Sequence, residues 1–350
     1  MTLRACAACF SASSWVANAS PPTGSTGTCD FGHEFSHRTW VTTAWVDSFT
    51  QLFALYEPGE DGSGEQLHIQ IQSDWSIFAL DREDDVQRFL QSAIPGHPLL
   101  DPDVKVKLRT PSDGPPADHL STWALFSEEI RTRNRYFPQG APNRIVLEEA
   151  LAARKEFIAV GQDLFRARVL PRGETFSTTD MGAPPPHKTP AGRANPVGIP
   201  YLYLSFSKET CLYEARVANH ARVAVGTMRT LRELVVVDLA DIEAPDFFGT
   251  YDDLDDVDLQ TPRVLTHRYL KALGEDLRRP VDIHEQPTDY IATQYLCEFA
   301  KSAGYDGVLY ASSQQPRGRN VVLFDKELAE CVSVETVKVV ELTARFEPAV

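Results

Sequence analysis

Five residues in the second half of the chain have side chains that suit one binding pocket. Arg166, Arg193, Tyr203 and Glu214 follow one another, and Ser312 arrives much later, in the segment YASS. Guanidinium groups bind phosphate or carboxylate oxygens through paired hydrogen bonds. An aromatic ring offers a stacking surface, and a single carboxylate can stabilise positive charge that develops during a reaction. These residue types predict a pocket for an anionic ligand that carries a ring.

A second set of residues at the start of the chain has the pattern of a metal site. Cys6 and Cys9 form a CxxC pair, and Cys29 and His33 follow in a second segment. Three thiolates and one imidazole can close a tetrahedron around Zn²⁺, the usual coordination of a structural zinc site. His37 is the alternative fourth ligand. The pattern predicts a zinc knuckle within residues 1–40, against the alternative of incidental cysteines.

The composition is that of a globular protein and argues against two classes of partner. The 350 residues are 43% hydrophobic and 24% charged, with a formal net charge of -15. Nucleic-acid binders present a basic face, so we expect no nucleic-acid partner. No apolar run approaches the ~20 residues that span a bilayer, so we expect no membrane partner. Six cysteines are too few for a disulfide scaffold, and the polar start of the chain makes a poor signal peptide, so the predicted location is the cytoplasm.

Hydrophobic periodicity predicts a mainly α-helical N-terminal domain at residues 41–160. Trp45, Phe49, Leu52, Phe53 and Tyr56 recur at the spacing of one helix face. The same reasoning predicts one or two short strands at 67–80. It predicts further helices at 84–94, 120–136 and 144–160.

From position 161 to 350, short apolar strands interleave with helices, which predicts an α+β domain. The strands are predicted in FRARV, YLYLSF, at 221–228 and 234–239, and in the segments YDGVLYASS and RGRNVVLFD. The helices are predicted at 208–220, 266–277 and 290–303. The acidic stretch between 245 and 260 is predicted to be a solvated loop.

The motifs of this domain resemble, in order, those of the RES domain family, which is named for an Arg, a Glu and a Ser. The resemblance runs through residues 164–330 and consists of FRAR, GRANPVGIPYLYLS, TCLYE, VVVDL, YDGVLYASS and RGRNVVLF. The front part of the chain, with its CxxC pair, resembles the zinc-containing helical extension that precedes some RES domains.

The resemblance implies an ADP-ribosyltransferase-like fold and NAD⁺ as the substrate. It places the family's Arg at Arg166, its Glu at Glu214 and its Ser at Ser312, with Ser313 as the alternative; the first three are the predicted catalytic residues. It also places Arg193 and Tyr203 in the NAD⁺ pocket.

The same residues suit NAD⁺ chemically. The pyrophosphate calls for Arg166 and Arg193, and the cationic nicotinamide ring can stack on Tyr203. Cleavage of the nicotinamide–ribose bond builds positive charge on the ribose, which Glu214 would stabilise. Asn320 joins the predicted NAD⁺-binding residues as a loop-fixing or ligand-contacting side chain.

Three functions follow from the resemblance. The first is an NAD⁺-degrading toxin or defence effector that uses water or phosphate as the acceptor. The second is a mono-ADP-ribosyltransferase that modifies a macromolecule, and the third is a non-catalytic NAD⁺ or ADP-ribose sensor. An inhibitory antitoxin and a second copy of the chain are the candidate protein partners, and the N-terminal extension is a candidate regulator of activity.

Overall fold

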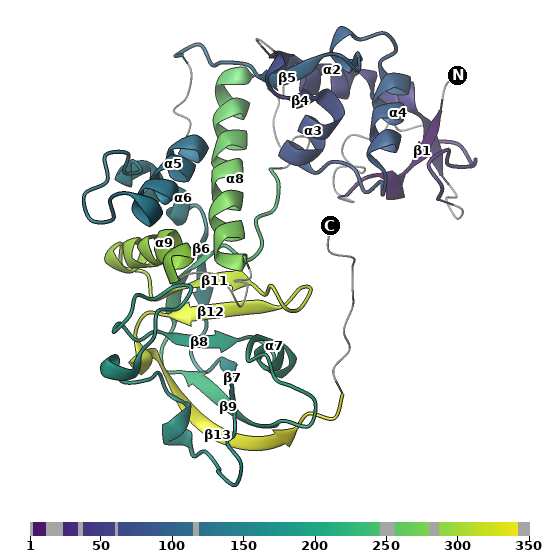
Figure 1. Ribbon diagram of the computed structural model, residues 1–350. Helices are drawn as coiled ribbons and strands as arrows, with labels where there is room; N and C mark the ends of the chain where they lie inside the picture. The colour runs from purple at the N-terminus through teal and green to yellow at the C-terminus, as the bar shows by residue number, and fades with distance from the viewer. Residues whose placement is uncertain are drawn as a thin grey trace. The chain divides into compact units, whose positions relative to one another are not determined.

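The structure is a computed structural model, and it describes residues 3–11, 24–33, 38–59, 62–114, 119–245, 256–279 and 287–341 (Figure 1). The chain divides into two compact units, each formed by two separate segments. Unit 1 consists of Met1–Asp118 and Glu243–Arg268, and unit 2 consists of His119–Ile242 and Tyr269–Val350. The long helix α8 (Val257–Arg278) therefore contributes its first part to unit 1 and its last part to unit 2.

Unit 1 combines helices with two small antiparallel sheets. Its helices are α2 (Val46–Ala54), α3 (Leu67–Trp75) and α4 (Glu83–Ala93), with one-turn helices η1 (Ala7–Cys9), η2 (Thr42–Trp45) and η4 (Pro98–Leu100). One sheet pairs β1 (Arg4–Cys6) with β2 (Thr39–Val41). The other has the order β3-β5-β4, formed by β3 (Tyr56–Pro58), β5 (Lys105–Leu108) and β4 (Glu65–Gln66). The N-terminal part is thus rich in helix but not purely helical.

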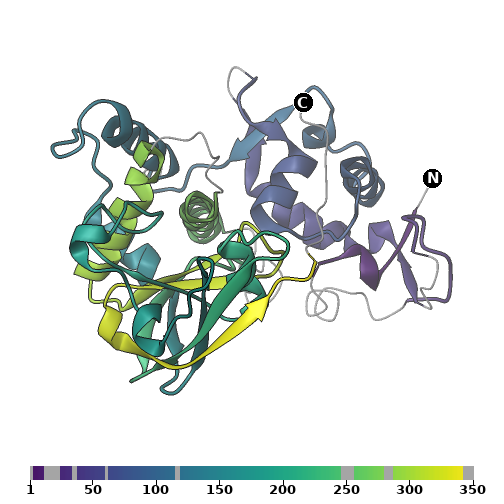
Figure 2. The ribbon, with the colours of Figure 1, turned by 60° about the horizontal axis from the view of Figure 1, so that its bottom comes forward.

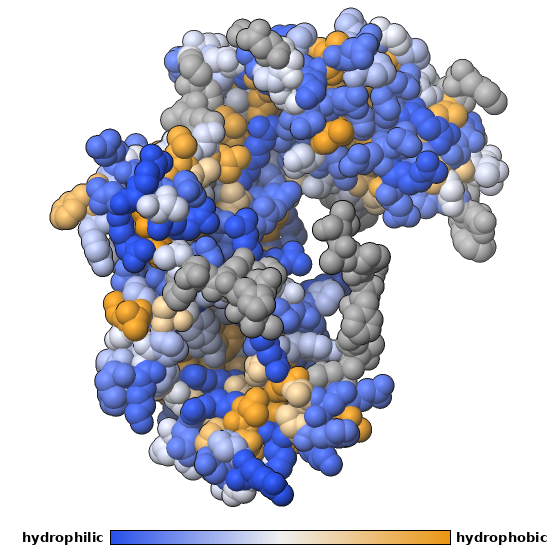
Figure 3. Space-filling model, viewed as in Figure 1, coloured by the Kyte–Doolittle hydropathy of each residue, from blue (hydrophilic) through white to orange (hydrophobic). Residues whose placement is uncertain are grey.

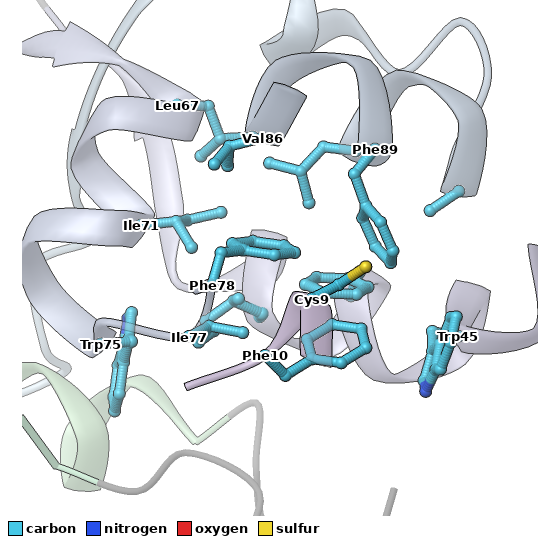
Figure 4. Close-up of a cluster of buried hydrophobic side chains, with 14 of the residues drawn as sticks. Cys9, Phe10, Trp45, Leu67, Ile71, Trp75, Ile77, Phe78, Val86 and Phe89 are labelled. Atoms are coloured by element: carbon cyan, nitrogen blue, oxygen red, sulfur yellow. The ribbon is translucent and has the colours of Figure 1, made fainter. Parts of the chain in front are cut away.

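Aromatic side chains form the centre of unit 1 (Figure 4). The ring of Phe89 on α4 lies 5.1 Å from that of Phe78 and 5.5 Å from that of Phe49, between ring centroids. Phe10 and Trp45 meet edge to face at 5.2 Å. Such aromatic pairs add to the stabilisation that burial of their apolar surface provides. The helical stripe predicted from Trp45 onwards is confirmed as far as Phe53 by η2 and α2, whereas its last member, Tyr56, begins β3.

The strands predicted at 67–80 are wrong, because most of this segment forms α3. The alternating letters HIQIQ suggested a strand, but Leu67, Ile71 and Trp75 are buried at four-residue spacing, which is a helical period. The helix also buries Asp74, which is fully inaccessible to solvent. Arg268 binds both of its carboxylate oxygens, from Nε and Nη2, at 2.7 Å each. This bidentate pair joins the two chain segments of unit 1.

Unit 2 is built on an eight-stranded sheet with the order β13-β9-β7-β8-β12-β11-β10-β6. Figure 1 shows this sheet, and Figure 2 shows it from another side. All neighbours are antiparallel except β10 and β11. The strands are β6 (Lys155–Ile158), β7 (Asp163–Val169), β8 (Leu202–Ser205), β9 (Arg222–Thr230), β10 (Leu234–Asp238), β11 (Gly307–Ala311), β12 (Arg319–Leu323) and β13 (Ala329–Lys338). The predicted α+β class is confirmed.

Alternation along the central strands gives the sheet two apolar faces. Val308 and Val322 share one core with α5 (His119–Thr132), α6 (Arg144–Ala152), the last part of α8 and α9 (Ile291–Ser302). Their neighbours Leu309 and Val321 belong to the core on the other face. The short helix α7 (Lys208–Glu214) packs on β7 and β8. Helices α5, α6, α8 and α9 thus pack on the face of the sheet that contains Val308 and Val322, and α7 packs on strands β7 and β8.

Several boundaries differ from the prediction, and the helix predicted at 120–136 ends at Thr132. The helix predicted at 144–160 ends at Ala152, and its last part is β6, which pairs with β10. The helix predicted at 208–220 ends at Glu214, since Arg216 has a positive φ of 48°. Within the acidic stretch, residues 246–255 lie outside the described residues, and α8 already begins at Val257. Strand β13 was not predicted, because its mostly exposed residues show no clear alternation.

Hydrophilic residues cover most of the face seen in Figure 3, and the apolar residues on it form small groups. No helix within the described ranges is long and apolar enough to cross a membrane. The sequence predicts three domains, with limits at residues 40 and 160. Whether these segments fold independently stays a prediction.

Candidate functional site

The register of four strands brings four side chains into one row across the sheet. Phe165 on β7 pairs with Ser205 on β8, Ser205 pairs with Asn320 on β12, and Asn320 pairs with Tyr310 on β11. Residues directly opposite one another in a sheet point to the same face. All four line a cavity of about 260 Å³. β7 pairs with β8 at Phe165 alone, and the cavity is lined by residues of both strands around that point.

Glu214 is the last residue of α7 and also lines this cavity. Ser207 caps the start of the helix by accepting a hydrogen bond from the Thr210 amide at 3.0 Å. The Glu214 Oε1 atom accepts two hydrogen bonds, from Ser312 Oγ at 2.7 Å and from Asn320 Nδ2 at 2.8 Å. Within the described residues, no donor reaches the second carboxylate oxygen. The carboxylate is therefore held through one oxygen, and its other oxygen keeps its capacity to accept hydrogen bonds.

The donors to Glu214 are themselves fixed. The Asn320 side chain accepts a hydrogen bond from Ser205 Oγ at 2.7 Å, and this leaves its amide nitrogen to face Glu214. Ser312 Oγ accepts from the backbone amides of Gln314 and Gln315, both at 3.1 Å. A serine hydroxyl has one hydrogen, so these contacts direct it towards the carboxylate.

The structure separates the two serines that the sequence left as alternatives. Ser312 is buried and contacts Glu214, although it does not itself line the cavity. Ser313 receives a hydrogen bond from the side chain of Gln314 at 3.2 Å and has no contact with Glu214. Of the two, only Ser312 belongs to the carboxylate's hydrogen-bond network.

Arg166 is half-buried and is one of the residues that line the cavity. Its Nη1 atom is buried and has no hydrogen-bond partner among the described residues. Loss of hydration on burial lowers the pKa of Arg166 to about 10, and the charge of nearby Arg168 acts in the same direction. A buried polar group without a partner is costly, and a buried cation more so. The arrangement favours an anionic ligand that would satisfy this group.

Tyr203 lines the cavity with its ring, while its hydroxyl is used elsewhere. The hydroxyl donates to Asn195 Oδ1 at 2.7 Å and accepts from the Ala194 amide at 3.0 Å. Burial raises the pKa of Tyr203, so the phenol stays protonated and keeps both bonds. The ring is left as the part that a ligand can meet.

Arg193 is adjacent to the cavity but is not one of its lining residues. Its guanidinium carbon lies 5.6 Å from the centroid of the Tyr310 ring, in the range of a cation–π contact. The Tyr310 phenol is buried, which raises its pKa. Arg193 is thus connected to the cavity through Tyr310.

Of the eleven residues that line the cavity, the sequence analysis missed seven, among them Phe165, Ser205 and Tyr310 of the row across the sheet. The signal for Ser205 is present in its strand, because Tyr203 and Ser205 are two apart on β8. Because side chains of a strand alternate, a prediction that one member faces a pocket extends to the other.

The predicted metal ligands also meet. Cys6 ends β1, Cys9 ends η1, and Cys29 and His33 flank a turn in which Gly32 has a φ of 86°. The four candidate ligand atoms all lie within 4.8 Å of one another. The fourth position is filled by His33, and His37 lies outside the described residues. A left-handed backbone at position 32 favours the glycine that stands there.

Four of the six separations within this cluster fit the edges of a zinc tetrahedron. His33 Nδ1 lies 3.5 Å from the sulfurs of Cys6 and Cys9 and 3.6 Å from that of Cys29, and Cys9 and Cys29 are 3.5 Å apart. Zinc bonds to sulfur and nitrogen of ordinary length give tetrahedron edges of about 3.5–3.8 Å. The shared hydrogen bond lowers the pKa of the Cys29 thiol to about 4 and raises that of Cys9. The cluster is compatible with a zinc site.

Comparison with known proteins assigns the second half of the chain. The model of the RES domain matches residues 163–345, which is just over half of the 350 residues. Among solved structures, the chain is similar to the M. tuberculosis MbcT–MbcA toxin–antitoxin complex, with 16% identity over 55% of this chain and 92% of that chain and a TM-score of 0.30. No curated protein matches the chain. On the family match, the chain belongs to the RES domain family.

Proposed function

We propose that this protein is an NAD⁺-consuming enzyme that cleaves the bond between nicotinamide and ribose. The observation that carries the proposal is the geometry of Glu214, whose carboxylate is held by Ser312 and Asn320 on the wall of a cavity that Arg166 also lines. The buried Nη1 atom of Arg166 has no hydrogen-bond partner among the described residues. The membership of the RES domain family supports the substrate.

Glu214 would act on the charge that develops during cleavage. As nicotinamide leaves, positive charge builds on the ribose ring, and a fixed carboxylate stabilises that charge more than it stabilises the ground state. Ser312 and Asn320 hold one carboxylate oxygen in place, so little reorganisation is needed. On this proposal Ser312 and Asn320 position the carboxylate, and the free oxygen of Glu214 faces the ribose.

The other residues would each bind a different part of NAD⁺. The rings of Tyr203 and Tyr310 lie on the cavity wall, where the flat nicotinamide can stack. Arg166 and Arg193 supply positive charge for the pyrophosphate. A cavity of about 260 Å³ is slightly smaller than the ~300 Å³ at which pockets for drug-sized ligands begin. It would enclose the nicotinamide–ribose end, and the rest of NAD⁺ would extend outside it.

The acceptor in this proposal is water or phosphate, which gives ADP-ribose or its 1″-phosphate. Transfer to a macromolecule would use the same residues, so the product distinguishes these reactions. We further propose that the enzyme acts as a toxin or defence effector under the control of an inhibitory partner. All six cysteines are free, which suits the reducing cytoplasm as its compartment.

For the N-terminal cluster we propose a structural zinc ion held by Cys6, Cys9, Cys29 and His33. The four ligands fill the tetrahedron and leave no open position for a substrate, so the ion would stabilise unit 1 and take no part in the chemistry.

The proposed activity is tested by incubating purified protein with NAD⁺ and following nicotinamide release and product mass. Glu214→Gln keeps the shape of the side chain and removes its charge, and we expect at least a 100-fold loss of turnover, as for other transition-state electrostatic groups. Glu209→Gln is the matched control, because Glu209 is an exposed glutamate on the same helix. Equal turnover by wild type and Glu214→Gln, or no nicotinamide release by folded wild type that binds NAD⁺, would contradict the proposal.

A further inference from the structure

Two polar residues are buried on helix α9, whose other buried residues are mostly apolar. Thr293 is 3% exposed and Gln294 is 9% exposed. A buried hydroxyl or amide is costly unless it forms hydrogen bonds. Both side chains find their partners outside the helix, in the loop that contains Arg193.

The hydrogen bonds of these two side chains go to consecutive backbone carbonyls. Gln294 Nε2 donates to the Gly192 carbonyl oxygen at 2.8 Å. Thr293 Oγ1 lies 2.5 Å from the Arg193 carbonyl oxygen and 2.9 Å from that of Tyr290, the residue that precedes α9. The hydroxyl has a single hydrogen, and the Arg193 oxygen is the nearer acceptor. About 100 residues separate donors from acceptors, so these are tertiary contacts.

The same loop is fixed from its other side by Tyr203, through the bonds of its hydroxyl to Ala194 and Asn195. The loop is also closely packed. A Cβ atom at Gly192 would lie 2.4 Å from Asn195 Oδ1 and 2.7 Å from the Tyr203 hydroxyl. The backbone of Arg193 is therefore held between α9 and β8, and its guanidinium lies over Tyr310.

We propose that Thr293 and Gln294 are positioning residues that set the affinity for the anionic part of the substrate by fixing the loop of Arg193. Neither residue lines the cavity, so both act through Arg193. The substrate part of this inference rests on the proposed NAD⁺-consuming function, whereas the fixing of the loop does not. The carbonyl groups of the two peptide units that flank the Arg193 Cα atom are both hydrogen-bonded, which restricts the start of the arginine side chain.

The loop is tested first without any ligand, by hydrogen exchange of the amides at 192–195. Thr293→Val removes the hydroxyl and keeps the shape, and Gln294→Met removes the amide donor. Each should accelerate exchange in the loop about three- to tenfold, in line with the loss of one hydrogen bond. Thr293→Ser should restore the wild-type rate. Thr132→Val is the matched control, since the Thr132 hydroxyl bonds only to Glu128 within its own helix.

The second test is a double-mutant cycle with Arg193→Ala, measured as KM and kcat for NAD⁺. Thr293→Val alone should raise KM about three- to tenfold and leave kcat within about twofold. In the Arg193→Ala background the same change should have no further effect, because its target is gone. An equal rise of KM in both backgrounds would show a general structural role and overturn the inference.

The two tests separate this inference from the proposed function. If wild type fails to consume NAD⁺, the proposed function and the substrate part of the inference fail together. The hydrogen-exchange experiment still tests whether Thr293 and Gln294 fix the loop of Arg193. Unchanged exchange in both Thr293→Val and Gln294→Met would overturn that part of the inference.

Discussion

The Ser312 hydroxyl lies 2.7 Å from Glu214 Oε1, although 98 positions separate the two residues in the chain. The same oxygen accepts from Asn320, and the hydroxyl of Ser312 is oriented by two backbone amides. The network places a single carboxylate at the end of a short helix, beside a row of side chains that four strands supply. Its consequences can be tested residue by residue.

The two adjacent serines should differ strongly on mutation. Ser312→Ala removes one of the two hydrogen bonds to Glu214, and we expect kcat to fall about 10- to 100-fold with little change in KM, because the loss is felt as charge develops. Ser313→Ala is the control and should change kcat less than about twofold. Steady-state kinetics of both variants would decide this, and similar losses in the two would contradict the assigned network.

The activity should not tolerate a replacement of Asn320 that puts an acceptor in place of the donor to Glu214. Asn320→Asp puts a carboxylate against Glu214 in place of a donor, and two like charges at hydrogen-bond distance raise the pKa of one of them. We expect a larger loss of kcat for Asn320→Asp than for Asn320→Ala, and a partial recovery below pH ~5, where one carboxyl becomes protonated. A pH–rate profile that is the same for both variants would count against this placement.

The affinity for an anionic ligand should fall at alkaline pH, because Arg166 loses its positive charge there. Burial lowers its pKa to about 10. The folded chain therefore releases this proton at a lower pH than the unfolded chain does, so the cost of burying the charge is present below pH 10 and declines as the pH rises above that value. Binding of an anion requires the charged form, and the Kd for ADP-ribose should rise as the pH passes about 10.

Two variants at this position extend the test. Arg166→Lys should lose affinity at a lower pH than wild type, because a lysine starts from a pKa of ~10.4 and burial lowers it further. Arg166→Met should abolish binding and stabilise the fold by about 1 kcal/mol, since it removes an unpaired buried cation. Calorimetric titration and thermal unfolding measure the two effects. Destabilisation by Arg166→Met would show that the guanidinium has a structural partner.

The N-terminal cluster should bind one zinc ion per chain. Elemental analysis of the purified protein measures the stoichiometry, and His33→Ala or Cys29→Ser should lower it. Removal of the metal by a chelator should lower the thermal stability of unit 1, because ligand binding to the native state stabilises it. Nicotinamide release should persist in His33→Ala at temperatures where unit 1 stays folded. An unchanged melting temperature after complete metal removal would refute the structural role.

The fold of the RES domain was more predictable than the contacts that complete its site. Short apolar strands and helical periods gave most elements of unit 2, and the ordered motifs led to Arg166 and Glu214. The segment 67–80 shows the opposite case, since HIQIQ fits a strand locally, whereas the burial of Leu67, Ile71 and Trp75 follows a helical period. The segment of strand β6 was predicted as the end of a helix, because its pairing with β10 depends on residues far away in the sequence.

The roles of Thr293 and Gln294 illustrate a limit of another kind. In the sequence they are two polar residues in the helical segment IATQYL, and a helical period alone gives no reason to bury them. Their partners are backbone carbonyls, which every residue possesses. The residue types at positions 192 and 193 therefore do not predict the contact. Such contacts depend on the path of the backbone and become visible only when the loop and the helix are placed together.

The bidentate pair between Asp74 and Arg268 has a consequence for biosynthesis. The two residues are 194 positions apart, so the ribosome releases Asp74 long before Arg268. Until Arg268 emerges, burial of Asp74 would leave a carboxylate without its counter-charge, which is strongly unfavourable. Unit 1 can therefore complete its fold only after His119–Ile242, the first segment of unit 2, has been translated. The N-terminal half of this protein must wait for the C-terminal half, although domains generally fold in the order of their synthesis.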